Sequence, residues 1–266
     1  MICIDDLGRK VNFQYPPTRI ISLVPSITEL LYELNIGDNI VAKTKFCIHP
    51  KIENENITLL KGTKNFEVDK IIQLRPDIVI ANKEENSKDL IEELLNYCPV
   101  YITDVNNITS ALKMIIDIGA ICNKNNEANI LATNIRTEIN NLPKMLSGRA
   151  AYLIWKQPLM SITGNTFINS MLELIGIDNI FKNREGNYPE VTQQEIIDNR
   201  PDYIFLSTEP YRFTNVHIPK FQSMFPNSKV LIIDGEMCSW YGSRMLKAIR
   251  YLNDFQSLLL NSSVYN

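Results

Sequence analysis

The sequence predicts an α/β fold with two three-layer lobes, mainly parallel sheets and one rigid helix joining the lobes. Three observations support this prediction. Short β-branched apolar runs alternate with helical patterns, which is typical of parallel strands covered on both faces. Two helix–strand patterns recur in the second half of the chain, and a polar helical stretch separates the halves. We expect an N-terminal lobe at 1–122, a connecting helix at 123–143 and a C-terminal lobe at 144–266.

The first lobe opens with a strand at 19–24, a short and unbroken apolar run. Ser26 is the candidate N-cap of the helix that follows, because Glu29 stands three residues later, the spacing of a capping box. A second helix is predicted at 68–74, and it ends before a proline that cannot continue it. The next strand is predicted at 78–81.

Two patterns link the halves of the chain. Glu-Leu followed by Asp-Asn-Ile occurs at 33–40 and again at 173–180, an offset of 140 residues (173 − 33). Ile-Ile followed by Arg-Pro-Asp occurs at 71–77 and again at 196–202, an offset of 125 residues (196 − 71). Because the patterns keep their order, we interpret the halves as two homologous α/β lobes.

The segment 123–143 contains no glycine and reaches a proline only at Pro143. Flexible linkers are normally rich in glycine and serine, so this composition favours a stiff helix of several turns. Two lobes on such a strut create a cleft, and small ligands bind in clefts between domains.

Composition excludes several classes of function. The 266 residues include 27 basic and 30 acidic side chains, a net charge of −3, without a basic cluster, so no nucleic acid partner is expected. The closest two of ten glycines, Gly235 and Gly242, are seven positions apart, so neither standard phosphate-binding loop can be written. The five cysteines are scattered without a C-x-x-C pair, which argues against a disulfide framework or zinc knuckle.

The first ten residues lack the basic and apolar regions of a secretory signal, which indicates a cytoplasmic protein. No apolar run approaches the ~20 residues of a membrane span, so no membrane insertion is expected. We expect a monomer.

Few residues are available for metal binding or catalysis. The histidines are His49 and His217, whereas a zinc site needs three or four protein ligands. Cys47 and His49 lie on one face if the backbone there stays extended, so both are candidate metal ligands. The alternative is a buried packing thiol and a hydrogen-bonding loop histidine. The adjacent Asp5 and Asp6 are interpreted as solvated surface, and without a G-x-S-x-G elbow no catalytic residue is predicted.

The stretch 234–244 follows an apolar strand and precedes an amphipathic helix. Trp240 lies in it, and Trp155 follows another strand. Ligands of parallel sheets bind outside the carboxyl ends of the strands, so these aromatic residues suggest stacking on a large flat ligand. The alternative is an aromatic plug that seals the end of the sheet. Tyr188 and Tyr211 follow the same logic more weakly, because each adjoins a proline and is compatible with a simple turn.

The chain resembles the substrate-binding proteins of ABC importers for cobalamin and iron-siderophores, the helical-backbone metal-receptor superfamily. The motifs that carry the resemblance are 19–30, 74–80, 164–168, 176–181 and 188–191. The tail motif at 234–244 is similar to that of a leaderless subgroup labelled cobalamin-binding protein. The resemblance implies two α/β lobes bridged by one rigid helix.

It also implies a non-catalytic protein that holds a metal chelate or corrinoid in the cleft for transport. The bound ligand would be cobalamin, haem or a ferric siderophore, with no prosthetic group. An ABC importer permease would be the partner. The resemblance implies a periplasmic or cell-surface location, whereas the missing signal indicates the cytoplasm. The alternatives are a cytosolic chelate-handling enzyme or chaperone that reuses the cleft, and an interaction scaffold.

The candidate site residues follow from both arguments. Flat contacts are assigned to Trp155, Tyr188, Trp240 and Tyr241, polar contacts to Lys83, Glu236 and Arg244, and metal contacts to Cys47 and His49. The resemblance places cleft tryptophans at Thr63 and Asn82, where this chain has none. It places the two acidic residues that dock on the transporter at Asp69 and Gln194. The second is glutamine in this chain and carries no charge, and Glu195 stands beside it.

Overall fold

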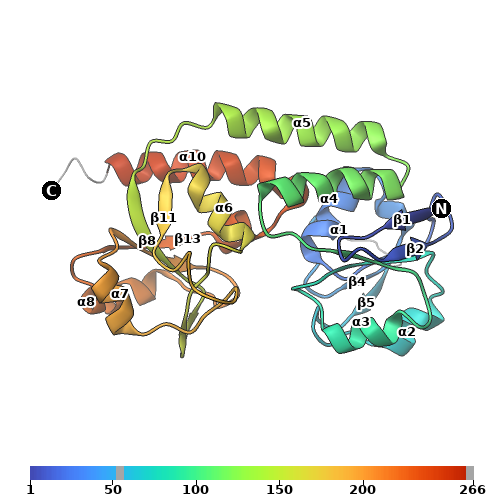
Figure 1. Cartoon of the computed structure of the whole chain (residues 1–266), viewed down its shortest axis with the longest axis horizontal. Coiled ribbons are helices and arrows are strands. Elements are labelled where there is room, and N and C mark those ends of the chain that lie inside the picture. The colour runs from blue at the N-terminus through green and yellow to red at the C-terminus, as the bar shows by residue number, and fades with distance from the viewer. Residues whose placement is uncertain (52–56, 262–266) are drawn as a thin grey trace. The chain divides into compact units, whose positions relative to one another are not determined.

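Two all-parallel sheets form the centres of two structural units in the computed structural model of the chain (Figure 1). The structure describes residues 1–51 and 57–261. The first unit comprises Met1–Val105, Thr109–Ile135 and Tyr241–Arg244, and the second comprises Asn106–Ile108, Arg136–Trp240 and Met245–Asn266. The α/β class predicted from the sequence is confirmed, with parallel pairing throughout both central sheets.

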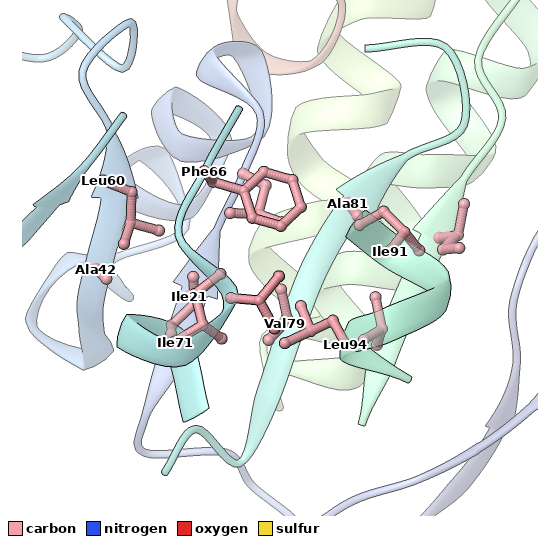
Figure 2. Close-up of a cluster of buried hydrophobic side chains, with 13 residues drawn as sticks. Ile21, Ala42, Leu60, Phe66, Ile71, Val79, Ala81, Ile91 and Leu94 are labelled. Carbon is pink, nitrogen blue, oxygen red and sulfur yellow. The ribbon is translucent and has the colours of Figure 1, made fainter. Parts of the chain in front are cut away.

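The first unit has a five-stranded sheet in the order β5-β4-β3-β6-β7. Its strands are β3 (Ile20–Ser22), β4 (Ile40–Thr44), β5 (Thr58–Leu60), β6 (Ile78–Asn82) and β7 (Val100–Thr103). Helices α2 (Val68–Gln73) and α3 (Lys88–Leu94) cover one face, and α1 (Pro25–Glu33) and α4 (Ile108–Ile121) cover the other (Figure 1). Ile21, Val79 and Ile71 are among the apolar side chains buried between the sheet and the α2–α3 layer (Figure 2).

An antiparallel hairpin precedes this sheet, with strands β1 (Ile2–Ile4) and β2 (Lys10–Asn12). Asp5 is buried, and its carboxylate accepts the backbone N–H groups of Leu7 and Arg9 at 3.0 and 2.9 Å, which closes the turn. The interpretation of Asp5 as solvated surface is therefore wrong, because its carboxylate is buried against the amides of its own turn and the Arg9 guanidinium.

The second unit has a four-stranded sheet in the order β11-β8-β12-β13. Its strands are β8 (Gly148–Leu153), β11 (Ile177–Asn179), β12 (Tyr203–Ser207) and β13 (Lys229–Ile233), and β9 (Trp155–Lys156) pairs with β10 (Leu159–Met160) in a small hairpin. The helices are α6 (Phe167–Leu174), α7 (Gln193–Asn199), α8 (Ile218–Met224), α9 (Gly235–Ser239) and α10 (Met245–Asn261). Short 3-10 helices also occur in the described residues, η1 (Gly37–Asn39), η2 (Asn215–His217) and η3 (Gly242–Arg244).

The internal repeat is visible in the sheets. The order β4-β3-β6-β7 in the first unit matches β11-β8-β12-β13 in the second. Arg75 and Arg200, the arginines of the repeated Arg-Pro-Asp, both adopt left-handed backbone conformations, with φ of 46° and 47°. This conformation ends each helix just before its proline.

The aspartates of the repeat bind the start of the neighbouring strand in the same way, β3 in the first unit and β8 in the second. The Asp77 carboxylate accepts the backbone N–H of Arg19 at 2.9 Å, and the Asp202 carboxylate accepts that of Arg149 at 2.7 Å. In return, the N–H of each aspartate donates to the carbonyl of the same arginine, at 2.9 and 2.8 Å. The two halves therefore share a hydrogen-bonded joint as well as a sequence pattern.

The capping box predicted at Ser26 and Glu29 is wrong. Helix α1 begins with Val24 as N-cap and Pro25 in the first turn, because the fixed φ of proline suits that position and its missing N–H is not needed there. A capping box does occur at α7, where Thr192 and Glu195 form both reciprocal hydrogen bonds.

The segment expected to join the lobes forms helix α5 (Asn125–Asn141). Its residues up to Ile135 belong to the first unit and those from Arg136 to the second. Within residues 1–51 and 57–261, no helix combines the length and apolar character needed to cross a membrane.

Candidate functional site

Each parallel sheet has one point where the chain connections leave neighbouring strands in opposite directions. In the first unit this switch point lies between β3 and β6, and in the second between β8 and β12. Ligands of open parallel sheets bind beyond the carboxyl ends of the strands at such points. The two switch points are equivalent under the internal repeat, so the side chains at each can be compared directly.

The switch point of the first unit is occupied by Tyr241–Arg244. The Tyr241 hydroxyl donates to Glu85, in the loop after β6, at 2.8 Å. Gly242 has φ of +88° and passes close to α1, where an added Cβ would lie 3.5 Å from the Ser26 carbonyl oxygen. Arg244 donates from Nε to the Glu29 carboxylate at 2.7 Å, and both side chains are buried.

Tyr241 and Arg244 thus make hydrogen bonds inside the first unit. Tyr241 is 4% exposed, and burial together with the Glu85 carboxylate raises the pKa of its phenol well above the usual value. This arrangement corresponds to the aromatic plug considered in the sequence analysis. We therefore leave Tyr241 and Arg244 out of the proposed ligand contacts.

The switch point of the second unit carries Trp155 and Tyr211. Trp155 begins β9, two residues after the end of β8, and is 38% exposed, with its indole N–H donating to the Gln157 carbonyl at 3.1 Å. The Trp155 and Tyr211 rings meet edge to face, with centroids 5.4 Å apart and an interplanar angle of 78°. The backbone N–H of Tyr211 donates to the Ile154 carbonyl at 3.3 Å, which fixes the two loops together.

Further side chains support Tyr211. The Phe213 ring lies 4.8 Å from the Tyr211 ring and the His217 ring 5.7 Å from it, both edge to face. The Lys156 ammonium lies 4.8 Å from the centroid of the Tyr211 ring, a cation–π contact. We call Trp155, Tyr211, Phe213 and His217 the aromatic cluster. Its exposed indole and adjacent ammonium suit a large flat ligand with polar substituents.

Three other predicted contacts lie in the second unit. Trp240 is 9% exposed and its indole N–H donates to the Glu209 carboxylate at 3.2 Å. Glu236 is half-buried in α9, a short helix that Asp234 caps at the start of the stretch 234–244. Tyr188 is half-buried in the segment between β11 and α7.

The predicted metal ligands Cys47 and His49 lie in the segment after β4, where the Cys47 N–H donates to the Thr44 carbonyl at 3.0 Å. Cys47 is buried and accepts a hydrogen bond from the Thr28 hydroxyl at 3.0 Å, and burial raises the pKa of its thiol. His49 is half-buried. Nowhere in the part of the chain that the structure describes do three or more His, Cys, Asp or Glu side chains gather to hold a metal ion.

The remaining predicted residues are charged and exposed to different degrees. Lys83 is exposed and pairs with Asp104 at 2.6 Å. Asp69 is exposed in the first turn of α2. The Glu195 carboxylate accepts the Thr192 backbone N–H at 2.7 Å and an Arg184 N–H at 2.7 Å, so it already caps helix α7.

A family model described as periplasmic binding protein matches residues 20–226. The chain belongs to the periplasmic binding protein family. The resemblance inferred from the motifs is thereby confirmed.

Individual relatives agree with this membership. The vitamin B12-binding protein of Vibrio parahaemolyticus is 24% identical over 197 residues, 72% of this chain and 71% of the relative. A possible iron-binding periplasmic solute-binding protein from Staphylococcus epidermidis has a similar fold, with a TM-score of 0.76, 22% identity, and coverage of 90% of this chain and 98% of the other. The periplasmic vitamin B12-binding protein of Vibrio cholerae gives a TM-score of 0.75 at 19% identity, covering 91% and 98%.

From the sequence of this periplasmic binding protein, Tyr211 is only a weak candidate for ligand contact. His217 is not a candidate. The repeat contained a signal for Tyr211, because β12 is the equivalent of β6 and residues after either strand lie at a switch point. For His217 no local signal exists, since its role depends on a turn that brings its ring back to Tyr211.

Proposed function

We propose that this periplasmic binding protein reversibly holds a metal chelate or corrinoid and delivers it to an ABC importer. The observation that carries the proposal is the exposed Trp155 indole set against Tyr211 at the switch point of the second unit. The relatives named for vitamin B12 and for iron support this class of ligand. Cobalamin, haem and ferric siderophores all combine a large surface with a metal, and none would be a prosthetic group here.

The aromatic cluster suits reversible binding. Stacking on an indole contributes apolar contact over a large area without a covalent bond, and aromatic contacts add about 0.5–1.5 kcal/mol beyond the area that they bury. Lys156 provides a cation beside the rings for an acidic or amide substituent. We assign Trp155 and Tyr211 as the main contacts, and Tyr188, Trp240 and Glu236 as surrounding residues.

The first unit offers separate apolar side chains at the carboxyl end of its sheet. Phe46 is 51% exposed and Ile48 49% exposed, in the segment after β4. The Lys45 ammonium lies 5.1 Å from the centroid of the Phe46 ring. We propose Phe46 and Ile48 as ligand contacts of the first unit, in place of the buried Tyr241.

Docking on an importer would use acidic side chains. Asp69 is exposed and suits this role, whereas Glu195 is already engaged with Thr192 and Arg184. We therefore propose that Asp69 makes the stronger contact with a permease, in a periplasmic or cell-surface setting.

The proposal is tested by titrating the protein with aquocobalamin, cobinamide, haem and ferrioxamine, with absorbance and Trp fluorescence as readouts. We expect saturable binding of at least one compound, weakened about tenfold or more in Trp155→Ala, as for a central aromatic contact. Tyr97→Ala is the matched control, because Tyr97 is 63% exposed but precedes β7, at the opposite end of the strands. No saturable change with any compound, or equal losses in both variants, would contradict the proposal.

A further inference from the structure

Ser207 is the last residue of β12, and its hydroxyl lies at the turn that leads to Tyr211. The side chain is buried, with 1% of the residue exposed. Its Oγ donates to the Glu209 carbonyl at 2.7 Å and accepts the Glu209 backbone N–H at 3.3 Å. One buried hydroxyl thus binds both backbone groups of the residue two positions before Tyr211.

The Ser207 hydroxyl is itself bound by the neighbouring strand. Tyr152 on β8 is fully buried, and its hydroxyl donates to the Ser207 Oγ at 3.0 Å. A hydroxyl has one proton and two lone pairs, so the bonds to Glu209 and Tyr152 use all three. Burial raises the pKa of the Tyr152 phenol well above its usual value, so this phenol keeps the proton that it donates.

Further contacts enclose the same turn. The Ser207 carbonyl accepts the Phe213 backbone N–H at 3.3 Å, and Thr208 Oγ1 accepts the Gly235 backbone N–H at 2.8 Å. A Cβ added to Gly235 would lie 2.7 Å from both the Glu209 nitrogen and the Ser207 Oγ. The turn therefore packs directly against the start of α9, without space for a side chain at Gly235.

The first unit has a similar arrangement at the equivalent position. Asn82 ends β6 and corresponds to Ser207 at an offset of 125 residues (207 − 82), the offset of the Arg-Pro-Asp patterns. Asn82 is 3% exposed, and its Oδ1 accepts the backbone N–H groups of Glu84 and Glu85 at 2.8 and 3.1 Å. In each unit a buried side-chain oxygen at the strand end thus binds the backbone N–H two residues later.

Tyr211 follows the turn of the second unit directly. Only Pro210 stands between Glu209 and Tyr211, and the proline ring fixes one of the two backbone angles of this residue. A change in the Glu209 backbone therefore has little room to be absorbed before Tyr211. The Tyr211 ring lies edge to face against Trp155, so such a change alters the contact with the exposed indole.

We propose that Ser207 is a positioning residue of the binding site, with Tyr152 as its support. The Ser207 hydroxyl holds the Glu209 backbone so that the Tyr211 ring stays against Trp155. The effect on ligand affinity rests on the proposed function, whereas the effect on the two rings is independent of any ligand.

The first test uses the two tryptophans of the chain and no ligand. Each indole N–H gives one signal in a ¹H–¹⁵N NMR spectrum, and Trp240→Phe identifies the signal of Trp155. Tyr211→Leu removes the neighbouring ring and shows where the Trp155 signal lies without it. We expect Ser207→Ala to move the Trp155 signal towards its position in Tyr211→Leu. An unmoved signal in Ser207→Ala would overturn the proposal.

Ser228→Ala is the matched control. Ser228 is 8% exposed in the same unit, and its hydroxyl donates to the Pro201 carbonyl at 2.7 Å. It precedes β13, so it lies at the opposite end of the strands. We expect Ser228→Ala to lower the urea midpoint of unfolding, as Ser207→Ala does, and to leave the Trp155 signal in place. Equal movement of the signal in both variants would contradict a positioning role for Ser207.

Tyr152→Phe is a milder second variant, because it deletes one hydroxyl and keeps the buried ring. It removes the donor to the Ser207 Oγ while the Ser207 hydroxyl itself remains. We expect a smaller movement of the Trp155 signal in the same direction. An unmoved signal would refute the supporting role of Tyr152 and, if Ser207→Ala does not fold, the proposal as a whole.

Titrations with the four compounds named above test the effect on binding. We expect the affinity of a compound that binds to fall about threefold to tenfold in Ser207→Ala, the range for one lost hydrogen bond, and to be unchanged in Ser228→Ala. Equal affinity in native protein and Ser207→Ala would refute the link to binding. If no compound binds, the proposed function fails, while the NMR tests still decide whether Ser207 positions Tyr211.

Discussion

Individual thiols of this protein show how burial limits chemistry. Cys47 is 4% exposed and lies against Thr28 and Thr44 in the first unit. Burial raises the pKa of the Cys122 and Cys238 thiols to about 12, and that of Cys47 in the same direction. The thiolate is the nucleophile and the metal ligand, so these groups are protonated and covered at neutral pH.

We therefore expect Cys47 to react with iodoacetamide at pH 7.5 about a hundredfold or more slowly in native protein than in urea-unfolded protein. Mass spectrometry of the Cys47 peptide over time measures this ratio, and the unfolded sample is the control. Rapid native labelling would instead favour the cytosolic enzyme or chaperone considered from the sequence.

At the scale of single elements, helix α7 shows a cap that depends on charge. The Thr192 backbone N–H, the Thr192 hydroxyl and Arg184 lower the pKa of the Glu195 carboxyl. A lowered pKa in the folded state adds stability that is present above the unfolded pKa, about 4.3 for Glu, and is lost as pH falls through the folded value.

The variant Glu195→Gln tests this cap, because glutamine can form a capping box without a charge. We expect the native protein to have the higher free energy of unfolding at pH 7, and the difference to shrink towards zero below about pH 4. Urea unfolding across this pH range measures it. Thr192→Ala, which removes the other half of the box, should cost about 1 kcal/mol at pH 7. A difference between native protein and Glu195→Gln that does not vary with pH would contradict the expected role of the charge.

Local elements were predictable where neighbouring residues decide them. The prolines of the two Arg-Pro-Asp patterns mark real helix ends, and the strand at 78–81 was confirmed as β6. The capping box predicted at Ser26 and Glu29 failed, because the Glu29 carboxylate binds Arg244, 215 positions away. No local pattern records such a partner. Trp155 was placed correctly at a strand end, whereas the turn that joins His217 to Tyr211 depends on tertiary packing.

For the whole molecule, the main departure from the sequence analysis is the path of the chain. The first unit was expected to consist of 1–122, but it includes Tyr241–Arg244 from near the other end of the chain. The ion pair between Arg244 and Glu29 is buried, with side-chain exposures of 4% and 10%. Removing one partner of such a pair leaves a charge without compensation.

We expect Arg244→Met to lower the free energy of unfolding by about 3–5 kcal/mol, as for other broken buried pairs. The double variant with Glu29→Gln should be less destabilised than the single changes summed. Urea denaturation followed by circular dichroism measures both. Lys88→Met is the control, because Lys88 and Glu92 form an exposed pair worth less than about 1 kcal/mol. Comparable losses in Arg244→Met and Lys88→Met would show that the buried pair is not a main support of the first unit.

The Arg-Pro-Asp joint has a consequence for how such a molecule can be altered. In both units, one aspartate ties the start of a central strand to the end of a helix through the same atoms. Residues 68–82 and 193–207 are therefore equivalent building blocks with matching attachment points. A block could be moved from one half to the other with its joint intact, whereas Tyr241–Arg244 and the aromatic cluster lie outside both blocks and would stay in their own unit. The helix–strand joint is thus common to both units, and the residues beyond the strand ends set them apart.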